Sequence, residues 1–85
     1  MEEFVISRHA REQMDLRGIS LQEVELTLRE PTGETKEPNG LTVFQRLFSN
    51  AEGHQYLLRI FVNKEANPAK IVTAYKTSKI LKYGS

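Results

Sequence analysis

The chain has no cysteine among its 85 residues, and it has only two histidines. The absence of cysteine excludes disulfide bonds, thiolate metal sites and a cysteine nucleophile. His9 and His54 lie in segments of different type, so a histidine-based metal site would need carboxylates that the sequence does not place beside them. We therefore expect chemistry that uses neither a metal nor a cofactor.

Long apolar runs and a basic leader are also missing. Residues 1–6, MEEFVI, are acidic and contain no extended apolar stretch, so they have the pattern of neither a signal peptide nor a membrane span. A chain of 85 residues has room for one small domain, which we expect to span residues 1–85. We expect a cytoplasmic protein that does not bind a membrane.

Acidic residues are scarce in the second half of the chain, so the net charge of +1 conceals an uneven distribution of charge. Residues 1–37 carry nine acidic and five basic side chains, whereas residues 38–85 carry two acidic and seven basic ones. The basic side chains from residue 69 onward, with no acidic residue among them, are Lys70, Lys76, Lys79 and Lys82. A basic tail with interleaved tyrosines suits an RNA backbone. Lysines also protect an edge strand from aggregation, and that explanation stays open.

Helix signals are concentrated in the first third of the chain. Ser7 is placed to cap a helix over residues 8–17. Ser20 and Glu23 have the spacing of a capping box, which predicts a second helix over residues 21–29. The two helices should form a hairpin.

The second half of the chain is rich in strand-forming residues. Its composition predicts strands over residues 41–48, 55–62 and 70–77, and residues 33–37 have the pattern of a further short exposed strand. We expect an α+β fold in which the helical hairpin packs on a three- to four-stranded antiparallel sheet. The pattern does not decide which face of the sheet meets the helices.

Several cationic side chains are candidates for chemistry. On a helical wheel, His9 and Arg17 flank the apolar stripe of the first helix. Histidine can act as acid or base near neutral pH, but beside a core stripe it is as often structural. Arg17 could equally complement the helix dipole. Arg59 lies between apolar neighbours in a central strand, where a charge usually has a carboxylate or phosphate partner, and Arg46 could act in the same way.

Short pieces at fixed spacing resemble a known family. The pieces are His9-Ala10 and Arg17-Gly18-Ile19, followed by a second helix ending at Pro31 and a strand-rich half closing in residues 71–75. Together they resemble the family called domain of unknown function 4258, over nearly the whole chain. One departure is Gln13, because arginine is frequent at that position in such sequences.

The resemblance implies a fold similar to that of RelE-like and barnase-like toxins. In that fold, N-terminal helices pack on one side of an antiparallel sheet and the other side holds RNA. The resemblance also implies a toxin module, with RNA and an antitoxin protein as partners. We expect the protein itself to be a monomer or weak homodimer.

RNA carries its own nucleophile, the 2′-hydroxyl, so cleavage needs a base, a cation at the phosphate and an acid, and no metal. We assign His9, Arg59 and Tyr75 as candidate catalytic residues, which requires His9 and Arg59 to converge on one concavity. The candidate RNA-binding residues are Arg17, Arg46, Thr73, Lys76, Lys79 and Lys82. The expected function is a metal-independent endoribonuclease toxin. A non-catalytic RNA-binding domain and a protein-interaction module that uses the helical hairpin remain alternatives.

Overall fold

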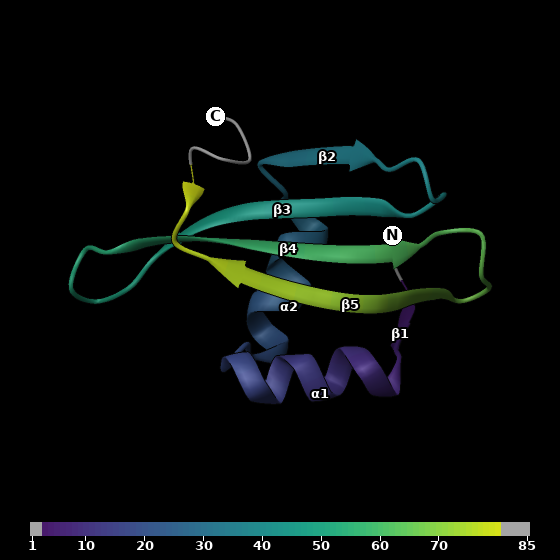
Figure 1. The fold of residues 1–85 in the computed structure, drawn as a ribbon, viewed down its shortest axis with the longest axis horizontal. Helices are drawn as coiled ribbons and strands as arrows, with labels where there is room; N and C mark the ends of the chain where they lie inside the picture. The colour runs from purple at the N-terminus through teal and green to yellow at the C-terminus, as the bar shows by residue number, and fades with distance from the viewer. Residues whose placement is uncertain (1–2, 81–85) are drawn as a thin grey trace.

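The structure is a computed structural model that describes residues 3–80. Its elements in chain order are β1 (Phe4–Ile6), α1 (Arg8–Arg17), α2 (Leu21–Arg29), β2 (Gly33–Lys36), β3 (Thr42–Ser49), β4 (Gln55–Asn63) and β5 (Ala69–Thr77). The strands form a five-stranded sheet in the order β1-β5-β4-β3-β2 (Figure 1). No helix in this part of the chain is both long enough and apolar enough to cross a membrane.

The sheet has more strands than the three or four expected, and it is not wholly antiparallel. Strands β2, β3, β4 and β5 pair antiparallel, whereas β1 pairs parallel to β5, with Phe4 opposite Ala69 and Ile6 opposite Ile71. A three-residue strand is too short to show a periodic pattern in the sequence. It forms because β5 supplies a hydrogen-bonding edge and because Phe4 and Ile6 pack against the core.

Local capping residues fix the two helices. The Ser7 hydroxyl accepts a hydrogen bond from the Ala10 amide at 3.0 Å and donates one to the Val72 carbonyl at 3.1 Å, so the cap also fastens α1 to β5. Gly18 ends α1 with φ of 65°, in the left-handed region. Ser20 and Glu23 form the expected capping box at the start of α2.

The helices occupy two different positions around the sheet. Figure 1 shows α2 crossing behind the sheet, while α1 runs alongside β5 at its edge. The buried core lies between the helices and one face of the sheet and contains Ala10, Met14, Ile19, Val24, Leu28, Phe44, Leu58, Ile60, Val62, Ile71 and Ala74. Within residues 3–80 no helix covers the opposite face, and we call it the open face.

The strand register decides which side chains reach the open face. Leu58, Ile60 and Val62 of β4 are fully buried on the helix side, so the alternate residues Arg59 and Phe61 project from the open face. Cross-strand pairing carries this alternation to the neighbouring strands. The open-face partners are Gln45 on β3, opposite Arg59, with Tyr75 and Thr73 on β5, opposite Arg59 and Phe61.

Candidate nucleic-acid interface

Arg59 stands at the centre of the open face. Its Nε atom donates a hydrogen bond to Oε1 of Gln45 at 3.3 Å, and its Cζ atom lies 5.4 Å from the centroid of the Phe61 ring. Its cross-strand partner on the other side is Tyr75. These contacts hold the guanidinium in place above the strands, where a planar fork can bind a phosphate.

A second guanidinium reaches the same place from α1. Gln13 and Arg17 are four residues apart and therefore share one side of the helix, and Arg17 Nε donates to Gln13 Oε1 at 3.1 Å. Arg17 Cζ lies 5.0 Å from the centroid of the Tyr75 ring, within the range of a cation–π contact. This contact joins the last turn of α1 to the open face of β5.

These side chains line one cleft between α1 and the open face. The cleft has a volume of about 320 Å³, and its lining residues are Gln13, Arg17, Arg59, Phe61, Thr73, Ala74 and Tyr75. Two guanidinium groups and no carboxylate belong to this set, which is drawn from residues 3–80. A concave surface with that charge attracts anions.

Apart from the core residue Ala74, two of the lining residues were missed by reasoning from the sequence. Phe61 lies two residues after Arg59 in a strand, so the period-two pattern already placed it on the same face. Gln13 lies one helical turn before Arg17. Both signals were present, but neither residue type drew attention as a site candidate. The predicted residues Arg17, Arg59, Thr73 and Tyr75 do come together here.

His9 is not among the residues that line this cleft. It lies exposed in the first turn of α1, eight residues before Arg17, which places their backbones about 12 Å apart along the helix axis. The convergence of His9 with Arg59 in one concavity, which the sequence reasoning required, is therefore not seen. On α1, His9 is four residues before Gln13, the first residue of the helix that lines the cleft, which is about 6 Å along the helix axis.

Arg46 lies on the helix-covered side of the sheet, away from Arg59. It pairs with the core residue Leu58, and its Nη1 atom donates a hydrogen bond to the backbone carbonyl of Glu30 at the end of α2. Its Cζ atom lies 5.7 Å from the centroid of the Phe48 ring. In this position the arginine satisfies a carbonyl at the end of α2 and lies outside the cleft.

Lys76 is also on the helix-covered side. It pairs with Leu58, and its Nζ atom lies 4.6 Å from the centroid of the Tyr56 ring. The Tyr56 ring stacks on Phe48 with centroids 5.5 Å apart. Among the other predicted lysines, Lys79 is exposed just beyond β5, and Lys82 lies outside the described residues.

Tyr56 and Glu23 form a polar contact between the sheet and α2. The Tyr56 hydroxyl donates a hydrogen bond to Oε2 of Glu23. Burial, together with the hydrogen bond and the negative charge of Glu23, raises the pKa of Tyr56 to about 12. Burial raises the pKa of Glu23, but hydrogen bonds from Ser20 and Tyr56 and the charge of Lys76 outweigh it and lower the pKa below its usual value.

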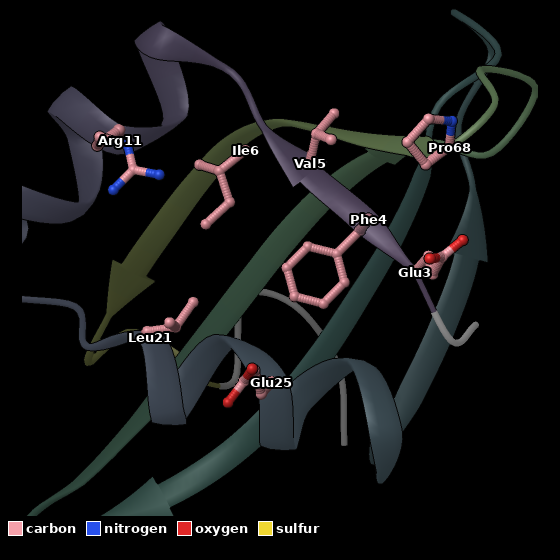
Figure 2. Close-up of a pocket in the computed structure, with 8 residues that line it drawn as sticks. All are labelled: Glu3, Phe4, Val5, Ile6, Arg11, Leu21, Glu25 and Pro68. Atoms are coloured by element: carbon pink, nitrogen blue, oxygen red, sulfur yellow. The ribbon is translucent and has the colours of Figure 1, made fainter.

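A larger groove of about 670 Å³ lies on the other side of α1, along β1. Its lining residues are Glu3, Phe4, Val5, Ile6, Arg11, Leu21, Glu25 and Pro68. Figure 2 shows Phe4 and Ile6 projecting from β1 towards α2, with Arg11 on α1 beside them. This groove has two carboxylates and one guanidinium, so its charge does not suit a polyanion as the open-face cleft does.

Comparison with known proteins identifies the family. The model of the family described as domain of unknown function DUF4258 matches residues 6–76, and the chain belongs to this family. No curated protein and no solved structure gives a significant match. Both arginines of the cleft and the aromatic residues beneath them fall within the matched range.

Proposed function

We propose that this protein is a metal-independent endoribonuclease toxin that binds RNA in the open-face cleft. The main support is the meeting of Arg17 and Arg59, from two different elements, on either side of Tyr75. Two planar cations beside a hydroxyl-bearing ring suit a phosphate with an adjoining base. A core-packing role alone would not require two arginines on the face of the sheet opposite the core.

In the proposed reaction the RNA 2′-oxygen attacks the adjacent phosphorus. The new O2′–P bond forms as the P–O5′ bond breaks, which leaves a 2′,3′-cyclic phosphate and a 5′-hydroxyl. Arg59 and Arg17 stabilise the negative charge that develops on the phosphorane. In this proposal the Tyr75 hydroxyl donates a proton to the leaving oxygen and His9 accepts the 2′-hydroxyl proton. Because His9 does not line the cleft, its role requires α1 and the open face to draw together around the bound RNA.

The arrangement of layers supports a RelE-like or barnase-like grouping. In the part of the chain that the structure describes, the helices pack on one face of the sheet and none packs on the other, as the resemblance implies (Figure 1). The proposal includes an antitoxin that masks the cleft and an RNA target in the cytoplasm. Lys79, just beyond β5, would add a phosphate contact outside the cleft.

A non-catalytic RNA-binding protein is the second candidate. It is favoured by the position of His9, which does not line the cleft that holds both arginines. RNA would then be held by Arg17, Arg59 and Tyr75 without a base close to the phosphate. The two candidates share one binding site and differ in whether the bound RNA is cut.

Induced expression in bacteria distinguishes the two candidates. We expect the wild-type chain to slow growth, and the purified protein to cleave RNA in the presence of EDTA. Arg59→Ala and His9→Ala should relieve both effects, whereas the control Arg29→Ala, an exposed arginine on α2, should not. Binding without cleavage would establish the second candidate. Growth arrest that survives both Arg59→Ala and Arg17→Ala would reject the site, and no effect on RNA would favour a protein-interaction module.

A further inference from the structure

We infer that the cleft selects single-stranded RNA and stacks an unpaired base on the Arg17–Tyr75 pair. This inference rests on the proposed RNA-binding function and adds the class of RNA that the site accepts. It concerns recognition and holds whether or not the RNA is cut.

Two arginine–aromatic pairs lie side by side in the cleft. Arg17 lies over the ring of Tyr75 at 5.0 Å, and Arg59 lies over the ring of Phe61 at 5.4 Å, each measured from Cζ to the ring centroid. Cross-strand pairing of Arg59 with Tyr75 makes the two pairs neighbours on the sheet. An arginine that needed only to attract phosphate would not have to lie over a ring.

The Arg17–Tyr75 pair offers a surface for a third planar group. Arg17 is exposed, Tyr75 is half-buried, and the hydrogen bond from Arg17 Nε to Gln13 fixes the edge of the guanidinium. The side of the guanidinium away from Tyr75 can therefore receive a base, since RNA bases stack on guanidinium planes as well as on aromatic rings. Gln13 acts here as a positioning residue.

Such a surface discriminates against duplex RNA. In a helix, each base is covered on both faces by its neighbours, so only an unpaired base can be splayed out onto a protein platform. The cleft volume of about 320 Å³ is at the lower end of the range for small-ligand sites, about 300–1,000 Å³, and suits a single base with its phosphate. Arg59 and the Thr73 hydroxyl, which also line the cleft, are placed to bind that phosphate.

Fluorescence anisotropy tests the inference. The probe is a short labelled RNA with 2′-O-methyl groups, which prevent cleavage, measured alone and after annealing to its complement. We expect the wild-type protein to bind the single strand at least tenfold more tightly than the duplex. Arg17→Lys keeps the charge but removes the planar group, so we expect it to lose about tenfold in single-strand affinity and nothing in duplex affinity. The control Arg11→Lys, on the other side of α1, should bind as the wild type does.

The outcomes separate this inference from the function on which it rests. No binding of either RNA would overturn the proposed function and the inference together. Equal affinity for the two RNAs, with Arg17→Lys unchanged, would overturn only the selection of single strands. Tyr75→Leu provides a second variant, and it should lose single-strand affinity while keeping the wild-type far-UV circular dichroism spectrum. Full affinity in Tyr75→Leu would also contradict base stacking on this pair.

Discussion

The guanidinium of Arg17, in the last turn of α1, lies 5.0 Å from the ring centroid of Tyr75 on β5. This contact joins α1 to the open face of the sheet, and it brings Arg17 into the cleft that also contains Arg59, the cross-strand partner of Tyr75. The positive charge and the aromatic lining of the cleft both depend on this contact between α1 and β5.

Removing the Arg59 guanidinium should weaken RNA binding through lost phosphate contact. We expect Arg59→Ala to reduce affinity for different RNA sequences by similar factors. We also expect it to lower the slope of log affinity against log salt concentration by about 1, as for the loss of one phosphate contact. Arg46→Ala provides a contrast, because Arg46 binds the Glu30 carbonyl on the helix-covered side and should affect stability while leaving the salt slope unchanged. Equal slopes for wild type and Arg59→Ala would contradict the phosphate role.

Alkaline solutions should destabilise the fold through Tyr56. Its pKa is raised from 10.0 to about 12 in the folded state, by burial and by Glu23, so the unfolded chain loses this proton first as pH rises. The stabilisation is complete below pH 10 and is lost between about pH 10 and 12. We expect the free energy of unfolding, measured with urea, to fall over that range. Tyr56→Phe should reduce stability by about 1 kcal/mol at neutral pH and flatten the alkaline decline.

Glu23 should make the stability of the fold depend on pH in the opposite direction, with stability falling as the solution becomes acidic. Its pKa is lowered in the folded state from the usual 4.5, so its contribution is present above that value and is lost as pH falls through the folded pKa. Glu23→Gln should make stability less dependent on pH in the acid range. The control Glu12→Gln, on the exposed side of α1, should follow the wild-type acid curve. A wild-type acid dependence in Glu23→Gln would show that this carboxylate does not carry the effect.

The Ser7 hydroxyl should contribute to stability through two hydrogen bonds, one that caps α1 and one to β5. Ser7→Ala removes the hydroxyl that accepts from Ala10 and donates to the Val72 carbonyl. We expect a loss of about 1–2 kcal/mol in the free energy of unfolding, because a helix cap and a tie to β5 disappear together. Ser49→Ala, an exposed serine at the end of β3, should change stability by less than about 0.5 kcal/mol. Equal effects of the two substitutions would contradict the tie.

Local signals were sufficient to predict the helices. The caps at Ser7 and Ser20 depend on contacts within three residues, and α1 and α2 begin directly after them. The strand β1 could not be predicted in this way. Its three residues become a strand only through β5, more than sixty positions later, which no local pattern indicates.

The sequence indicated which residue types belong to the candidate site, but it did not indicate on which face of the sheet each residue lies. Arg59 and Tyr75 were identified, but Arg46 and Lys76 were grouped with them because the sequence alone did not say which sheet face meets the helices. The register resolves this, since Arg46 and Lys76 both pair with Leu58, a fully buried core residue. A register shift between Phe61 and Val62 adds an irregularity to the pairing of β4 with β5 that a period-two pattern does not anticipate.

The most direct test of the account is an NMR titration of the ¹⁵N-labelled protein with a non-cleavable single-stranded RNA. We expect the largest amide and side-chain shifts at Arg17, Arg59, Thr73 and Tyr75, with little change along the β1 groove at Val5 and Leu21. Shifts confined to that groove, or no shifts at saturating RNA, would contradict the assignment of the open-face cleft as the RNA-binding site.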